Sequence, residues 1–191
     1  MTAAIADEIK YDWKLPFRIP HSRKNILFTT RWDNYPDSAQ VPISGKASHA
    51  YLLLAGSTNP MQSHIANGRI TITYSDGSRQ VTDLVNPETW CPVEQDYFTD
   101  SLAFKMNKPK PWRLHFKTGL VSQDLGSDLK INGVYGREID GGAGMLLDIP
   151  LDPQKELSTL TVETLSNDVL VGLMAITLQR MHNIVHPSIG Q

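Results

Sequence analysis

The chain contains 191 residues, 40% of them hydrophobic and 20% charged, and carries a formal net charge of −2. This size and composition predict a single domain with one sizeable core. The near balance of charge provides no basic footprint for nucleic acid or for an anionic membrane surface, and we expect neither as a partner. The single cysteine, Cys91, excludes an internal disulfide and a cysteine-rich zinc site, and is most simply a buried apolar side chain.

Residues 1–24 are expected to form a lead-in to the domain. Their opening, MTAAIADEIKYDW, lacks the charged and apolar segments of a secretory signal. Apolar runs in the chain fall short of the roughly 20 residues that span a bilayer, so a soluble chain is expected. We place a β-sandwich domain at residues 25–180 and a C-terminal tail at residues 181–191.

Short β-rich segments follow one another from residue 25 onward, and long amphipathic helical patterns are missing between them. The apolar runs YLLLA and VLVGLM, which begin at Tyr51 and Val169, indicate central strands covered on both faces or a bend at Gly172. A turn at Asn167-Asp168 predicts a C-terminal hairpin. The expected strands are residues 25–32, 48–55, 69–75, 78–85, 101–106, 112–117, 145–149, 157–165 and 169–179.

The strongest local signal is RITITYSDGSRQVTDL, in which an Asp-Gly turn joins two alternating runs. Ile70 and Ile72 alternate with polar residues in the first run, and Val81 and Leu84 approximate the same pattern in the second, with one slip in the alternation. Together the strands predict an all-β fold, an antiparallel two-sheet β-sandwich with no long helix. The expected core residues are Leu52, Leu54, Ile70, Ile72, Leu147, Leu160, Val162, Leu170 and Met174.

Four connections are longer or more polar than simple turns require: residues 32–45, 56–68, 86–100 and 118–144. Loops held on a rigid sandwich commonly carry the binding residues, so the function is expected there. The segment NKPKPW at residues 107–112 indicates only a proline-stiffened connector.

Five segments carry a family resemblance: ILFTTRWDNYPD, AYLLLAGSTNPMQS, ITITYSDGS, LVNPETWCPVEQDYFTD and DVLVGLMAITLQR. This succession resembles a C-terminal β-sandwich region of large, uncharacterised Bacteroidetes proteins whose other part resembles a six-hairpin glycosidase. It is also similar to galactose-binding-like jelly rolls that accompany glycoside hydrolases. The resemblance implies a jelly-roll topology, a carbohydrate ligand, a catalytic domain as partner and a secreted or periplasmic location.

Two loops combine aromatic rings with polar groups, as the recognition of a sugar ring requires. We expect them to form one ligand-binding surface. The alternative is that their aromatic residues are core or anchoring side chains. The candidate ligand-binding residues are Trp32, Asp33, Asn34 and Tyr35 in the first loop, and Glu94, Gln95, Asp96 and Tyr97 in the second.

Glu94 and Asp96 are the candidate catalytic carboxylates. In an extended segment they would project to the same side with their Cα atoms about 6.6 Å apart, within reach of a glycosidase pair. Solvated carboxylates, or ligands of a structural Ca²⁺ ion, are alternatives, although the chain has no EF-hand loop. The preferred prediction therefore has no catalytic residue and no metal site, and catalysis by Glu94 and Asp96 stays an alternative.

The sequence contains no motif for a zinc protease, a serine hydrolase or a nucleotide-binding enzyme. His182 and His186 are four residues apart but lack the glutamate of HExxH, and the GxSxG and phosphate-loop patterns do not occur. Three hypotheses follow. The first is a non-catalytic carbohydrate-binding or accessory module associated with glycoside hydrolases. The alternatives are a structural domain packed against a catalytic neighbour, or a small glycosidase that uses Glu94 and Asp96.

Overall fold

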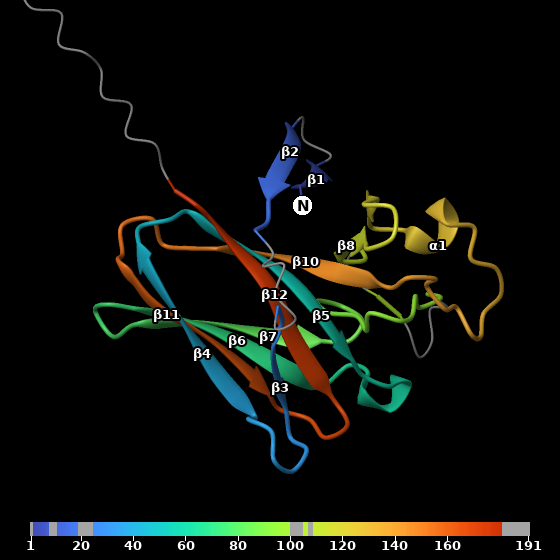
Figure 1. Ribbon diagram of the computed structural model, residues 1–191, viewed down its shortest axis with the longest axis horizontal. Helices are drawn as coiled ribbons and strands as arrows, with labels where there is room; N and C mark the ends of the chain where they lie inside the picture. The colour runs from blue at the N-terminus through green and yellow to red at the C-terminus, as the bar shows by residue number, and fades with distance from the viewer. Residues whose placement is uncertain (1, 8–10, 19–24, 100–104, 107–108, 181–191) are drawn as a thin grey trace, which may run out of the picture.

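The computed structural model describes residues 2–7, 11–18, 25–99, 105–106 and 109–180. Two antiparallel sheets pack together (Figure 1), which confirms the all-β sandwich. The jelly-roll topology stays a prediction. The six-stranded sheet has the order β3 (Leu27–Thr30), β12 (Leu170–Gln179), β5 (His49–Ser57), β10 (Ala143–Pro150), β8 (Trp112–His115) and β9 (Val121–Ser122). The four-stranded sheet has the order β4 (Ser38–Gly45), β11 (Leu157–Thr164), β6 (Ala66–Tyr74) and β7 (Arg79–Val85).

The predicted β6–β7 hairpin is confirmed. Gly77 has φ 84° in the turn, a conformation that suits a residue without a Cβ atom. On β7 Leu84 is fully buried, whereas Val81 is 53% exposed. Two residues separated by three positions point to opposite faces of a strand, so only Leu84 reaches the core.

The prediction of a C-terminal hairpin between β11 and β12 is wrong. β11 pairs with β4 and β6, whereas β12 pairs with β3 and β5, so the turn at Asp168 carries the chain from one sheet to the other. The amides of Leu165 and Ser166 donate to the carbonyl of Asn67 at 2.9 and 3.2 Å. These bonds fasten the end of β11 to its own sheet before the chain crosses over.

The main core lies between the inner faces of the two sheets. Leu147 and Leu170 are only partly buried, and Met174 packs on the outer face. Val171 and Leu173 face the core from β12, because the inward positions of this strand are odd-numbered as far as Leu173. The irregularity between Leu173 and Ala175 then shifts the phase, so that Ile176 and Leu178 pack against the core. The predicted core residues that are fully enclosed are Leu52, Leu54, Ile70, Ile72, Leu160 and Val162.

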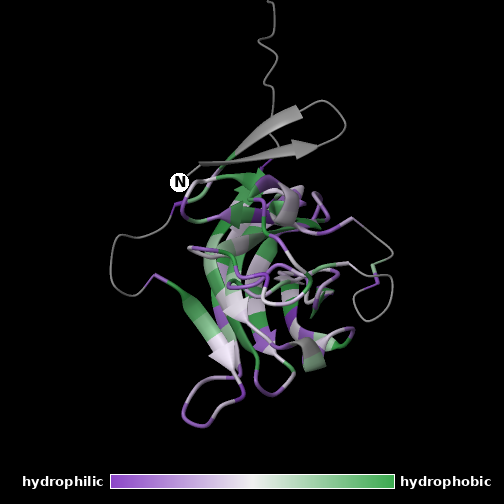
Figure 2. Ribbon diagram, turned by 90° about the vertical axis from the view of Figure 1, so that its right-hand side faces the viewer, coloured by the Kyte–Doolittle hydropathy of each residue, from purple (hydrophilic) through white to green (hydrophobic). Residues whose placement is uncertain are grey.

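A second apolar cluster covers the outer face of the six-stranded sheet. Leu53, Leu114 and Leu146 pack there with Leu15 and Phe17 of the N-terminal segment. β5 is therefore apolar on both faces, as its continuous run predicts. Figure 2 shows hydrophobic residues along the strands and hydrophilic residues in many of the loops.

Several elements differ from the expected ones. β4 lies inside the predicted loop 32–45, and β9 and the short helix α1 (Leu125–Asp128) lie inside the predicted loop 118–144. The lead-in contains a hairpin of β1 (Thr2–Asp7) and β2 (Tyr11–Pro16), and a 3-10 turn spans Pro60–Gln62. Residues 101–104 of an expected strand lie outside the described residues, and Lys105 and Met106 are not in a strand. In the part of the chain that is described, helices are too short to cross a membrane.

Candidate functional site

The chain after β7 is fastened against the segment that leads into β10. The amide of Asp96 donates to the carbonyl of Arg137 at 2.9 Å, and the amide of Ile139 donates to the carbonyl of Glu94 at 2.9 Å. Gln95 forms an antiparallel bridge with Glu138 between them. This short ladder places Asp96 and Arg137 side by side.

A buried arginine on β8, Arg113, fastens the segment after β7 to the six-stranded sheet. Arg113 donates to the carbonyls of Gln95, Pro92 and Ala143 at 2.8, 2.6 and 3.1 Å. Three carbonyl contacts from one rigid guanidinium fix the loop relative to the sheet. Cys91 is buried beside it, and burial raises the pKa of its thiol to about 11, so this side chain behaves as the expected apolar group.

Asp96 and Arg137 form a buried ion pair. Nη2 of Arg137 donates to Oδ2 of Asp96 at 2.6 Å, and their side chains are 4% and 9% exposed for Asp96 and Arg137 respectively. Nη1 of Arg137 donates to the carbonyls of Ile131 and Gly133 at 2.9 and 3.1 Å. The guanidinium therefore fastens the loop after α1 to the ladder.

Lys110 and Asp124 complete the charged cluster. Nζ of Lys110 lies 3.7 Å from Oδ1 of Asp96 and 3.7 Å from Oδ1 of Asp124. Asp124 caps α1, because its carboxylate accepts from the hydroxyl of Ser127 at 2.7 Å and from its amide at 3.4 Å. The hydroxyl contact is the main reason that the pKa of Asp124 is lowered, with Lys110 contributing.

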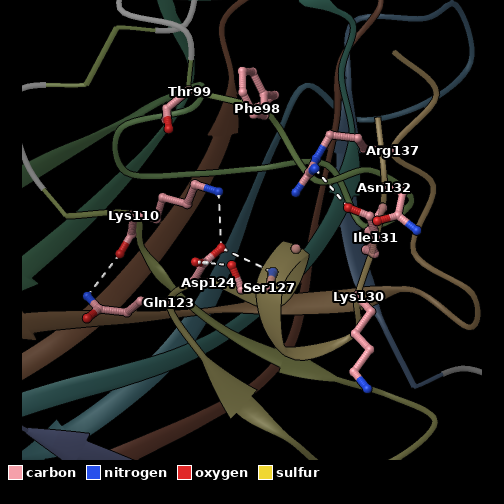
Figure 3. A pocket seen from close by; sticks show the side chains of 11 residues that line it. Phe98, Thr99, Lys110, Gln123, Asp124, Ser127, Lys130, Ile131, Asn132 and Arg137 are labelled. Carbon is pink, nitrogen blue, oxygen red and sulfur yellow. Dashed lines mark hydrogen bonds and ion pairs between the residues drawn. The ribbon is translucent and has the colours of Figure 1, made fainter. Parts of the chain in front are cut away.

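Lys110, Asp124 and Arg137 line an open cleft of about 890 Å³ (Figure 3). The size falls within the range of small-molecule sites. The ring of Phe98, 42% exposed, supplies an apolar wall, and the guanidinium of Arg137 lies 5.8 Å from its centroid. The cleft is defined by Phe98, Lys110, Gln123, Asp124, Asn132 and Arg137, together with Thr99, Gly126, Ser127, Lys130 and Ile131.

The first predicted loop forms an exposed turn at the end of β3. The amide of Tyr35 donates to the carbonyl of Trp32 at 3.3 Å, and Asn34 has φ 69°, a conformation that asparagine tolerates. Trp32, Tyr35 and Asp33 are all exposed. The ring of Tyr35 lies 5.4 Å from that of Phe28, so one aromatic side chain of the turn is braced by another.

The second predicted loop is divided between solvent and interior. Glu94 is exposed and accepts a hydrogen bond from Ser57 at 2.9 Å, and Gln95 is half-buried. Asp96 is enclosed with Arg137. Tyr97 is also buried, where its hydroxyl accepts a hydrogen bond from Asn86 at 3.3 Å. Burial raises the pKa of Tyr97 to about 12.

None of the eight predicted ligand-binding residues lines the cleft, although the second loop continues directly into Phe98, which does. Trp90, which precedes this loop, is fully buried and donates to Oδ1 of Asn67 at 3.0 Å. Trp90 therefore anchors the start of this segment in the core.

Sequence reasoning missed Lys110, Asp124 and Arg137. Lys110 belongs to the segment that was interpreted as a connector only, and it reaches the charged cluster from there. The Asp124-Leu-Gly-Ser order is a helix-capping signal that could have located α1. The other two side chains carry no local signal, because they join Asp96 only through tertiary contacts.

Clusters of three or more histidine, cysteine or carboxylate groups suited to a metal ion are absent from the described residues. The structural calcium ion stays a hypothesis. Comparisons with known proteins identify no relative: no family model, curated protein or solved structure matches this chain.

Proposed function

We propose that this protein is a non-catalytic carbohydrate-binding or accessory module that uses the cleft around Phe98 and Arg137. The observation that carries the proposal is an exposed aromatic ring beside fixed polar groups in an open cleft. A pyranose ring has an apolar face suited to stacking and hydroxyl groups suited to hydrogen bonding. Asp96 acts as a positioning residue, because it holds Arg137 in the wall.

The resemblance to sandwich regions that accompany glycoside hydrolases supports carbohydrate over other polar ligands. It also supports a catalytic domain as partner and a galactose-binding-like jelly roll. The exposed aromatic turn around Trp32 and Tyr35 offers a second surface for the same class of ligand.

A glycosidase that uses Glu94 and Asp96 is less well supported. Both carboxyl groups of such a pair must face one substrate. Glu94 is exposed beside Ser57, whereas Asp96 is enclosed in an ion pair with Arg137. The carboxylate of Asp96 is thus occupied by a cation.

A glycan array of plant and host oligosaccharides tests the proposal. Hits are titrated calorimetrically against the wild type, Phe98→Ala and the matched aromatic variant Tyr35→Ala. We expect a Kd between about 1 mM and 10 μM, because sugar hydroxyls exchange water for protein contacts at little net gain. Loss of the Phe98 ring should weaken binding about 3- to 10-fold.

Absence of binding to every glycan on the array would reject the carbohydrate proposal and favour the structural domain. Glycan turnover that disappears in Glu94→Gln would favour the enzyme. Weaker glycan binding by Tyr35→Ala, with unchanged binding by Phe98→Ala, would assign the site to the exposed turn instead of the cleft.

A further inference from the structure

The charge that lines the cleft differs from that of the whole chain. Three cations, Lys110, Lys130 and Arg137, face two carboxylates, Asp124 in the wall and Asp96 beneath it. The local balance is therefore one positive charge, whereas the chain as a whole has a formal net charge of −2. Separation of charge in this way concentrates positive potential in a concave site.

Both carboxylates of the cleft have partners within the protein. Asp96 accepts from Arg137 at 2.6 Å, and Asp124 accepts from the hydroxyl of Ser127 at 2.7 Å and caps α1. Lys110 adds an ion-pair contact to each of them. Asp96 is 4% exposed and lies out of reach of a ligand, whereas Asp124, with its side chain 60% exposed, keeps acceptor sites for the hydroxyl groups of a sugar.

Hydrogen-bond donors of the cleft are less fully used. Nζ of Lys110 lies 3.7 Å from each carboxylate, which is longer than a hydrogen bond, and points across the cleft toward Asp124 in Figure 3. Lys130 is exposed and has no ion-pair partner within the described residues. Nε of Arg137 is buried and, in the same part of the chain, has no hydrogen-bond acceptor.

We infer that the cleft selects acidic carbohydrate, a sugar that carries a carboxylate group, and places that group beside Lys110. A carboxylate accepts hydrogen bonds and carries the charge that the cleft lacks. The ring of Phe98 packs against the sugar ring while Lys110 contacts its acid group. Lys130, whose side chain is directed away from Lys110 in Figure 3, adds positive potential to the cleft. This inference rests on the proposed carbohydrate-binding function and specifies its ligand.

The test is a panel in which each uronic acid oligosaccharide is paired with its methyl ester. The esters keep the sugar rings and remove the charge. Oligomers of galacturonate, glucuronate, mannuronate and guluronate are titrated at about 50 mM and 500 mM NaCl. We expect at least one acid to bind about tenfold more tightly than its ester and to lose several-fold in affinity at the higher salt concentration, because salt screens exposed charges.

Three lysine variants locate the effect. Lys130→Gln should weaken binding of the acid about 2- to 3-fold and Lys110→Gln about tenfold, with little change for the ester. Lys46→Gln, in the exposed β4–β5 turn at the opposite end of the molecule from α1 (Figure 1), is the matched control and should change neither. Lys130→Gln keeps the test valid if loss of Lys110 disturbs the fold, since Lys130 has no structural partner among the described residues.

Equal binding of acids and esters, or binding of neutral glycans only, would overturn the acidic selectivity and leave the carbohydrate proposal intact. Unchanged selectivity in both Lys110→Gln and Lys130→Gln would overturn the assignment to this cleft. Absence of binding to all acids, esters and neutral glycans would overturn both proposals.

Discussion

Asp96 and Arg137 form a 2.6 Å ion pair across 41 residues of sequence, enclosed at the base of the cleft. The pair joins the segment after β7 to the segment before β10, and through the other donors of Arg137 it also holds the loop after α1. A buried ion pair stabilises little relative to apolar groups, but loss of one partner leaves an uncompensated charge. The cleft therefore depends on both residues.

Asp96→Asn is expected to lower the free energy of unfolding by about 3–5 kcal/mol, because Arg137 would remain buried without its counter-ion. Urea denaturation followed by tryptophan fluorescence measures the change. The control is Glu94→Gln, an exposed carboxylate two residues away, which should change the stability by about 0.5 kcal/mol or less. Equal stability of the two variants would show that the ion pair has no structural role.

Gly126→Ala should displace the same ion pair. A Cβ atom on Gly126 would lie 1.8 Å from Nη2 of Arg137 and 2.6 Å from Oδ2 of Asp96. The guanidinium cannot move without breaking its contacts, so we expect a lower melting temperature and weaker glycan binding. Asp128→Ala, an exposed position in the same helix, should leave both quantities nearly unchanged. A wild-type melting temperature for Gly126→Ala would contradict this close packing.

Ile72 and Val81 allow a matched comparison between a buried and an exposed apolar side chain. Ile72 on β6 is buried between the sheets, and Ile72→Ala should cost about 2–5 kcal/mol because it leaves a cavity. Val81 on the neighbouring β7 is half-exposed, so Val81→Ala should cost about 0.5 kcal/mol or less. Chemical denaturation of both variants checks the strand phase, and a larger loss for Val81→Ala would reverse it.

The β6–β7 turn contains a carboxyl group with a strongly shifted titration. Hydrogen bonds from Ser78, with a contribution from Lys155, lower the pKa of Asp76 from 3.8 to about 2. The folded state therefore gains stability from Asp76 above its ordinary pKa and loses it as the pH falls from about 4 through about 2. A carboxyl ¹³C NMR titration should give a midpoint near 2, and Ser78→Ala should raise it. A wild-type midpoint near 4 would rule out these contacts in solution.

Local sequence patterns predict the strands whose side chains alternate or are continuously apolar, such as β5 and β6. They do not predict β4, because Pro42 and the half-exposed alternation of this edge strand are equally typical of a loop. The crossing from β11 to β12 was also missed. A turn at Asp168 has the same local chemistry whether the next strand joins the same sheet or the opposite one.

The candidate site was predictable only in part. The predicted residues 94–97 lie next to Phe98 in the sequence, but Phe98 and Thr99 line the cleft and the four predicted residues do not. Lys110 and Arg137 could not be assigned to it, because they approach Asp96 from separate, non-periodic segments. Burial of Asp96 also depends on these tertiary partners, so its sequence context alone resembled that of an exposed loop.

The most direct test of the central claim is a ¹⁵N NMR titration of the wild-type protein with the tightest oligosaccharide from the glycan array. Binding in the cleft predicts saturable shifts in the amides of Phe98, Gln123, Ser127 and Asn132, with little change around Trp32 and Tyr35. Shifts confined to the Trp32–Tyr35 turn, or no saturable shift at any amide, would contradict the assignment of carbohydrate binding to the cleft.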